Sequence, residues 1–177
     1  WKETQMILAG ARTSRLPDED DAAFCRRIRD EGQAESIAAA EFGTRLHAAI
    51  AYGAGVDDED LLPFLDGFHE WAQSALGAPS ASEKCFAVPS EGYGGRVDYV
   101  GTLDGREVVI DWKSQSSEPG KPFKHYPDVG AQLAAYGRGI DESLPVVSVV
   151  ISSTEPGRLE VHEWENRDSY WRAFTYC

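Results

Sequence analysis

Two aspartates and a lysine lie close together in residues 94–114, a stretch whose pattern predicts a β-hairpin. The Asp-Gly pair at 104–105 is a strong signal for a two-residue turn, and a turn there places Asp98 directly across from Asp111. Lys113 follows two residues later and therefore shares the face of Asp111. Two carboxylates at that range repel each other unless a cation lies between them. The spacing thus predicts a site for a hard divalent cation, which prefers oxygen ligands.

The alternation of side chains divides this hairpin into two faces. The face expected to pack on the core carries Val97, Tyr99, Val108, Ile110 and Trp112. The opposite face carries Arg96, Asp98, Val100, Val109, Asp111 and Lys113. Arg96 is expected to lie across from Lys113. The alternative to a cation site is a solvated face with a diagonal salt bridge between Asp98 and Lys113, and the hairpin pattern alone leaves both interpretations open.

Helical patterns occupy the first part of the chain. A region rich in Ala, Glu and Leu predicts a helix from about residue 20 to residue 52. A second helix is predicted over residues 58–76, with Asp57 or Asp58 near its cap and Pro63 in its first turn.

The remainder of the chain alternates between strand and helix patterns. Strands are predicted over residues 82–90, 95–102, 107–113, 145–154 and 158–164, and helices over 128–140 and 166–174. Residues 145–154 are almost wholly apolar, as in a strand buried on both faces, and residues 117–127 form a Pro-rich loop. The resulting order, α-α-β-β-β-α-β-β-α, predicts an α/β fold with a mixed central β-sheet flanked by helices and an N-terminal helical part.

The composition limits the class of protein. The length of 177 residues suits a single domain, expected over residues 1–177 with a helical part at about 20–77 and a catalytic core at about 82–177. The net charge of −13 argues against a broad basic surface for nucleic acid, although bound cations can make a local site positive. The three cysteines are scattered without a CxxC pair, so we expect a reducing, cytoplasmic compartment. No apolar run approaches the ~18 residues of a membrane span, so no membrane partner is expected.

Two further motifs connect the hairpin to a known family. Residues 43–47 read GTRLH, and residues 132–136 read QLAAY. Together with Asp98 and the Asp-Trp-Lys run at 111–113, this pattern resembles the PD-(D/E)XK nuclease superfamily. The two added motifs resemble those of its RecB-like exonuclease branch, and all three occur in the order of that branch.

The resemblance implies a restriction-endonuclease-like core and a metal-dependent nuclease that hydrolyses phosphodiester bonds of DNA. The ligands of one or two Mg²⁺ or Mn²⁺ ions would then be His47, Asp98, Asp111 and the backbone carbonyl of Trp112. Lys113 would position the attacking water, and Gln132 and Tyr136 would align the scissile strand. Accessory roles are expected for Glu83, Arg45 and Arg96.

The same resemblance implies an exonuclease that acts on DNA with a free or single-stranded end. Lys121, Lys124 and His125 are expected to form one wall of the substrate channel, and a protein partner or a homo-oligomer is a further candidate source of grip. Some RecB-like nucleases hold an iron–sulfur cluster with four cysteines, and this chain is not expected to do so. His69, His125 and His162 belong to no motif.

Two other functions fit parts of the pattern. A catalytically idle nuclease fold would serve as a module for binding nucleic acid or protein, but it has no need to keep Asp98, Asp111 and Lys113 together. A structural Ca²⁺ site normally draws its ligands from one loop, which a pair of aspartates on a sheet face does not resemble.

Overall fold

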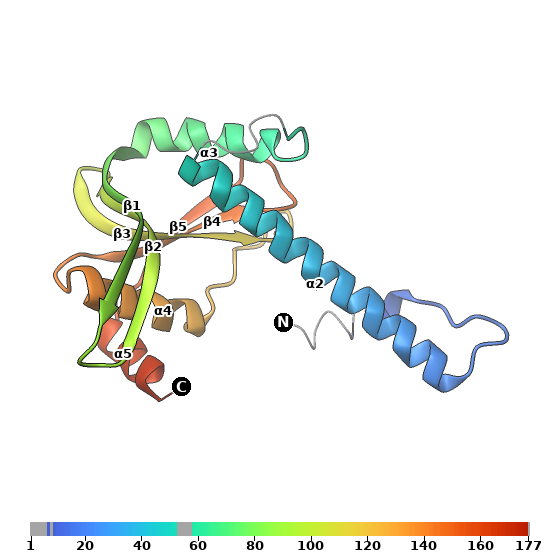
Figure 1. Ribbon diagram of the computed structural model, residues 1–177. Coiled ribbons are helices and arrows are strands. Elements are labelled where there is room, and N and C mark those ends of the chain that lie inside the picture. The colour runs from blue at the N-terminus through green and yellow to red at the C-terminus, as the bar shows by residue number, and fades with distance from the viewer. Residues whose placement is uncertain (1–6, 8, 53–57, 177) are drawn as a thin grey trace. The chain divides into compact units, whose positions relative to one another are not determined.

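The computed structural model describes residues 7, 9–52 and 58–176. Its backbone divides into two compact units, Trp1–Arg45 and Leu46–Cys177. The elements, labelled as in Figure 1, are α2 (Asp21–Tyr52), α3 (Leu62–Ala75), β1 (Leu76–Val88), β2 (Tyr93–Leu103), β3 (Arg106–Gln115), α4 (Pro127–Ile140), β4 (Val146–Ser152), β5 (Leu159–Glu163) and α5 (Arg167–Thr175). Their order is the predicted one. Within the described residues, no helix is long and apolar enough to cross a membrane.

Helix α2 begins where a side chain caps it. The backbone N–H of Ala23 donates to Asp20 Oδ1 over 2.7 Å, which satisfies one of the free donors at the helix start. The helix predicted over residues 20–52 is confirmed at both ends. In the second unit, the end of α2 contributes Leu46, which is fully buried, and the neighbouring His47.

Helix α3 starts without the predicted cap. Leu61 occupies the N-cap position and makes no side-chain hydrogen bond to the helix, whereas Pro63 lies in the first turn as expected. The Asp58 carbonyl instead accepts hydrogen bonds from the backbone N–H groups of Leu61 and of Leu62, the first residue of α3. The cap predicted at Asp58 is therefore wrong, and Asp57 lies outside the described residues.

Strand β1 follows α3 directly, at Leu76 rather than at residue 82. Its first half contains small and polar residues with weak strand preference, which explains why the sequence pattern missed it. Pairing with β2 holds this half in place, beginning with Leu76 opposite Leu103. The Tyr99 hydroxyl also donates to the Gly77 carbonyl over 3.0 Å.

The described strands form one five-stranded sheet in the order β1-β2-β3-β4-β5. β3 and β4 are parallel, and the other neighbouring pairs are antiparallel, so the sheet is mixed as predicted. α4 lies in the connection between the two parallel strands, as a parallel pair requires. Figure 1 shows α3 over one face of the sheet and α4 and α5 over the other.

The turn between β2 and β3 has the predicted register. Asp104 and Gly105 both have positive φ, 49° and 80°, as a two-residue hairpin turn of the I′ type requires. The ladder begins with Leu103 opposite Arg106 and continues to Tyr99 opposite Ile110. The Asp-Gly signal in the sequence was therefore sufficient to set which β2 and β3 residues face one another.

One irregularity changes the faces expected for β2. Glu83, in the middle of β1, has a φ of 51°, in the left-handed region that residues other than glycine rarely adopt. The residues on either side of Glu83 in β1 are paired regularly with the residues on either side of Asp98 in β2. On β2, Val97 packs on the α4 side, whereas Tyr99 packs against Trp112 on the α3 side, with ring centroids 5.8 Å apart. The prediction that Val97 and Tyr99 share one face is therefore wrong.

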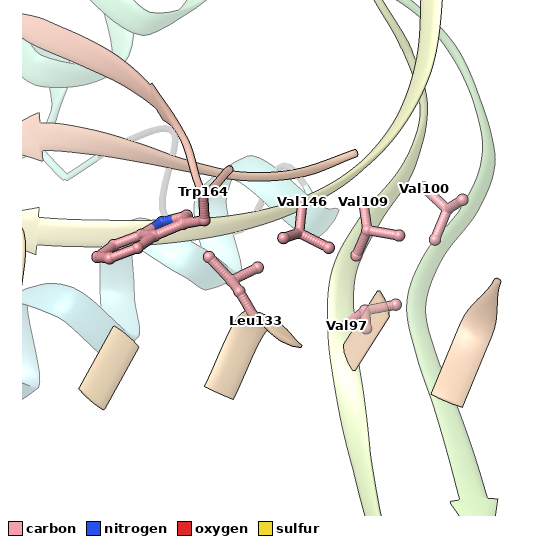
Figure 2. Packing of buried hydrophobic residues seen from close by; sticks show 6 residues of the cluster. All are labelled: Val97, Val100, Val109, Leu133, Val146 and Trp164. Carbon is pink, nitrogen blue, oxygen red and sulfur yellow. The ribbon is translucent and has the colours of Figure 1, made fainter. Parts of the chain in front are cut away.

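The core on the α4 side joins three strands to that helix (Figure 2). It consists of Val97, Val100, Val109, Leu133, Val146 and Trp164. Val100 and Val109 were expected on the chemistry-bearing face, and both are buried here because α4 covers that part of the sheet. The charged residues at the end of the hairpin therefore border a packed core.

The core on the α3 side is built around aromatic rings. The Phe68 ring of α3 meets the Trp112 ring edge-to-face, with centroids 5.4 Å apart. Leu65 of α3 and Ile110 of β3 are also buried. Helices on both faces explain why β4 is buried along its whole length, as its apolar pattern predicted.

A histidine pair packs between β5 and the loop that precedes α4. The His125 and His162 rings stack with centroids 3.8 Å apart, and His125 Nε2 lies 2.6 Å from Glu160 Oε1. Trp164 meets the His162 ring edge-to-face at 4.6 Å. Burial lowers the pKa of His162, and the adjacent His125 lowers it further, whereas Glu160 and Glu165 act in the opposite direction.

We predict that His162→Gln makes the protein less sensitive to acid. Because the pKa of His162 is lowered in the folded chain, the unfolded chain takes up a proton more readily, and stability falls as the pH drops below the ordinary histidine value of 6.5. Denaturant unfolding at about pH 7.5 and about pH 5.5 should show a smaller loss of stability in the variant than in the parent. His69→Gln, at an exposed position of α3, is the control and should retain the loss seen in the parent. Equal losses in His162→Gln and the parent would contradict the prediction.

Candidate active site

The sheet divides at the two aspartates. The β2–β3 ladder ends at Tyr99 opposite Ile110. Beyond that pair, β2 continues along β1, and β3 continues along β4 with Asp111 opposite Ser148. Arg96 consequently lies opposite Cys85 of β1, and the expectation that it faces Lys113 is wrong. The two strands separate here because each follows a different neighbour, which opens a fork with an aspartate on each side.

The Asp98 carboxylate spans the fork. Its Oδ2 atom accepts a hydrogen bond from the backbone N–H of Trp112 over 2.8 Å, a position where a continuous ladder would place a backbone carbonyl. The same oxygen lies 3.6 Å from His47 Nδ1 at the end of α2. Asp98 is 8% exposed. The carboxylate is therefore held in place from β3 and from α2, which excludes a solvated face at this position.

The Asp111 carboxylate is buried beside it, with 3% of the residue exposed. Lys113 Nζ lies 2.6 Å from Asp111 Oδ2, yet this buried oxygen accepts no hydrogen bond of standard geometry. Burial raises the pKa of Asp111, Lys113 opposes this effect, and the negative charge of Asp98 adds to it. The salt bridge of Lys113 is thus to Asp111, and the diagonal pair with Asp98 is not the arrangement observed.

His47 responds to both carboxylates. Burial disfavours its charged form, but the hydrogen bond to Asp98 and the charges of Asp98 and Asp111 outweigh burial, so the pKa of His47 is raised. Lys113 acts in the opposite direction. The imidazole, the two carboxylates and the ammonium therefore form one electrostatic cluster.

Helix α4 extends this cluster with two side chains one turn apart. Lys113 Nζ donates to Gln132 Oε1 over 3.0 Å, and Gln132 Nε2 donates to the Tyr136 hydroxyl over 2.6 Å. Both residues share a face of α4 because they are four positions apart, and Leu133 beside them anchors the helix in the core. The structure thus brings together the predicted residues Asp98, Asp111, Lys113, Gln132 and Tyr136 with His47.

One comparison with known proteins identifies the family of the chain. The model of the PD-(D/E)XK nuclease superfamily matches residues 8–147, which is more than half of the chain. The chain belongs to the PD-(D/E)XK nuclease superfamily. Members of this superfamily are generally nucleases that use divalent metal ions, so the assignment supports a nuclease activity.

The other comparisons add little to the PD-(D/E)XK assignment. The solved structure described as "Crystal structure of SSO0001" matches over 96% of this chain and 81% of that chain, at 17% identity and a TM-score of 0.38. No curated protein matches the chain. The assignment therefore rests on the family model and on the residues that form the site.

Packing around Tyr136 was not predicted from the sequence of this PD-(D/E)XK protein. The Phe86 ring meets the Tyr136 ring edge-to-face, with centroids 5.8 Å apart. A Cβ on Gly95 would lie 2.9 Å from the Tyr136 ring, and a Cβ on Gly139 would lie 2.1 Å from the Phe86 ring. Glycine inside a strand pattern is the available signal, since it marks close approach of another group.

The predicted accessory residues have different outcomes. Glu83 and Arg96 form an ion pair, with Arg96 Nε 2.9 Å from Glu83 Oε2, next to Asp98 along β1 and β2. Arg45 belongs to the first unit, so its role stays a prediction. The Trp112 carbonyl as a metal ligand also stays a prediction, although the Trp112 N–H has a defined place in the fork.

The loop expected to line a substrate channel is hydrogen-bonded to the turn between β4 and β5. Lys121 Nζ lies 2.5 Å from Glu118 Oε2, and His125 pairs with Glu160. Arg158 donates to the carbonyls of Glu118 and Lys121. Lys121 and His125 are therefore partnered within this part of the protein, and a channel wall made by them and Lys124 stays a prediction.

The site of this PD-(D/E)XK chain has the chemistry of a cation site. Asp111 Oδ2 is a buried carboxylate oxygen that has the Lys113 ammonium group 2.6 Å away but accepts no hydrogen bond of standard geometry, and a second buried carboxylate and an imidazole lie close to it. These are ligand types that Mg²⁺ and Mn²⁺ accept. Within the described residues, no group of three or more His, Cys, Asp or Glu side chains has the arrangement of a complete metal site. Full coordination therefore requires backbone, water or substrate oxygens in addition to these side chains.

The two cysteines among the described residues, Cys25 and Cys85, are free and exposed. Cys25 lies in the first unit and Cys85 on β1 of the second. The third cysteine of the chain, Cys177, lies outside the described residues.

We predict that Asp98→Ala is less stable than Asp98→Asn by about 1–3 kcal/mol. Asn keeps an oxygen that accepts the Trp112 N–H, whereas Ala leaves this buried donor unpaired. Both substitutions remove the charge, so the difference between them reports the hydrogen bond across the fork. Urea denaturation of the two variants measures this difference.

The control uses the exposed residue Asp66 of α3. There, Asp66→Ala should be at least as stable as Asp66→Asn, because Ala has the higher helix propensity. Equal stability of the two Asp98 variants would show that the carboxylate does not hold the fork together.

Proposed function

We propose that the protein is a metal-dependent deoxyribonuclease of the RecB-like branch, which acts as an exonuclease on DNA ends or single strands. The observation that carries this proposal is the convergence of two buried carboxylates with the chain Lys113–Gln132–Tyr136 at the fork between β2 and β3. The RecB-like assignment is supported by the GTRLH and QLAAY motifs, whose residues His47, Gln132 and Tyr136 join the aspartates in one cluster.

In this proposal, Asp98, Asp111, His47 and the Trp112 carbonyl hold one or two Mg²⁺ or Mn²⁺ ions. The buried Asp111 oxygen without a hydrogen bond, and the second carboxylate beside it, support the assignment. A bound divalent ion would stabilise negative charge on a phosphoryl oxygen and lower the pKa of a neighbouring water molecule. Glu83, which has a positive φ, lies on β1 between the residues that pair with the two neighbours of Asp98 on β2.

Lys113 has the central role among the remaining residues. Its ammonium group has three donors, which suits it to orient an attacking water and to stabilise negative charge that develops on the phosphate. Gln132 directs the ammonium group by accepting one hydrogen bond from it, and Tyr136 holds the Gln132 amide in place. Gln132 and Tyr136 are half-buried, so their remaining surface is available to align the scissile strand.

The substrate is proposed to be DNA with a free or single-stranded end, as the RecB-like motifs suggest. The net charge of −13 means that grip on DNA must be local, because the protein as a whole repels a polyanion. Arg96, with 61% of its side chain exposed next to the fork, is the proposed contact for a flanking phosphate, and its pairing with Glu83 fixes its direction. Arg45, a protein partner or self-association would supply the remaining grip.

We predict that the purified chain degrades end-labelled linear DNA with Mg²⁺ or Mn²⁺ and not with EDTA. Asp111→Asn and Lys113→Ala should each lower the cleavage rate by about 100-fold or more, because each removes a charge that acts at the reacting phosphate. Gel electrophoresis of the labelled products over time measures the rate. A covalently closed circle should be spared, since the proposed exonuclease needs an end.

The controls are matched in chemistry and lie away from the fork. Asp66→Asn on α3 and Arg172→Ala on α5 are at exposed positions and should retain the parent's rate. DNA binding without metal-dependent cleavage would support the idle nuclease fold in place of the enzyme. Equal cleavage by the parent and by Asp111→Asn would show that the activity does not belong to this site.

A further inference from the structure

The ammonium group of Lys113 is held between two acceptors. Its Nζ atom lies 2.6 Å from Asp111 Oδ2 and donates to Gln132 Oε1 over 3.0 Å. The lysine side chain is 30% exposed, whereas the Asp111 side chain is 4% exposed. The Asp111 carboxylate is therefore almost fully covered, whereas part of the Lys113 side chain beside it is open to solvent.

The same Asp111 oxygen is the one most suited to a cation. It is buried, negatively charged and without a hydrogen bond of standard geometry. A divalent ion and an ammonium group on the same carboxylate oxygen repel each other strongly, because their positive charges would lie only about 4 Å apart in a site of low dielectric constant. Binding of an ion at Asp111 Oδ2 therefore favours movement of Lys113 away from this oxygen.

Gln132 can retain the ammonium group when that happens. A lysine only donates hydrogen bonds, so the amide oxygen of Gln132 must face Lys113 and its NH₂ group must face away. The Tyr136 hydroxyl accepts from this NH₂ group over 2.6 Å, which stabilises that orientation. The Tyr136 ring is in turn packed against Phe86. The amide oxygen is thus a fixed acceptor beside the carboxylate.

We propose that Lys113 competes with the divalent ion for Asp111 Oδ2 and is displaced from this oxygen when the ion binds. Gln132 is the acceptor that keeps the Lys113 ammonium group within the site after displacement. This inference rests on the proposed function, since it concerns the ion of that same site. It assigns Gln132 a positioning role that acts through Lys113. The affinity for the ion then depends on the free energy of moving the Lys113 ammonium group from Asp111 Oδ2 to Gln132 Oε1.

The proposal predicts opposite effects of two substitutions on metal binding. Lys113→Met removes the competitor and should tighten binding of Mn²⁺ in the absence of DNA by about tenfold. Gln132→Ala removes the acceptor that retains the displaced ammonium group and should weaken binding by about tenfold. In the double variant, Gln132→Ala should have no further effect, because the lysine through which it acts is gone.

Isothermal titration of the full chain with Mn²⁺ measures these affinities without any reaction. Lys124→Met is the matched control, since it removes the same charge at an exposed position in the loop before α4 and should leave the affinity near that of the parent. Tighter binding by Lys124→Met to the same extent would show that net charge alone is responsible. Weaker binding by Gln132→Ala in both backgrounds would show that Gln132 acts on the ion directly. Either result would overturn the proposal.

A second measurement uses the parent alone and does not depend on the folding of a variant. The side-chain ammonium signal of Lys113 in a proton–nitrogen correlation spectrum should shift on titration with Mg²⁺, while that of Lys124 should not. A Lys113 signal that stays unchanged at saturating Mg²⁺ would contradict displacement. If the parent cleaves DNA while Lys113→Met binds Mn²⁺ no more tightly, only the displacement is wrong. If no variant binds the ion and the parent does not cleave, the proposed function fails as well.

Discussion

The repulsion between two buried carboxylates is the constraint on which the rest of the site depends. Asp98 and Asp111 are 8% and 3% exposed, and two unscreened charges in such a place are costly. The fold compensates with the Trp112 N–H on Asp98, the Lys113 ammonium group on Asp111, and His47 next to both. In the proposed function two of these groups also act in the chemistry, His47 as a metal ligand and Lys113 as a hydrogen-bond donor. Groups that stabilise the buried carboxylates in the fold are therefore also groups that the proposed chemistry uses.

The backbone creates the space for these charges by giving β2 and β3 different neighbours. Above the fork the strands pair with each other, and below it β2 follows β1 while β3 follows β4. Glu83 has a positive φ on β1 next to the fork, and Val97 of β2 is buried in the core on the α4 side. Figure 2 shows this core directly, with Leu133 of α4 packed among residues of the strands. The same helix carries Gln132 and Tyr136, so the packing of Leu133 also places the hydrogen bonds to Lys113.

Local signals in the sequence were enough to predict much of this arrangement. The Asp-Gly turn set the hairpin register, and the apolar run in β4 predicted a strand buried on both faces. The helix that carries Gln132 and Tyr136 was predicted from the residue pattern of 128–140. The pairing of Arg96 with Lys113 failed because register beyond the turn depends on which strand each partner meets next, and that is a property of the whole sheet. The left-handed conformation of Glu83 is invisible in sequence, since nothing in a glutamate signals a positive φ.

The central claim is that Asp98 and Asp111 bind one divalent ion together with His47. Anomalous scattering from crystals of the protein grown with Mn²⁺ tests it most directly, because the signal locates the ion without reference to activity. We predict a peak within about 2.0–2.4 Å of an oxygen from each aspartate, with Lys113 Nζ moved off Asp111 toward Gln132. A manganese peak elsewhere in the protein, with Asp98 and Asp111 still in their ion-free contacts at saturating Mn²⁺, would contradict it.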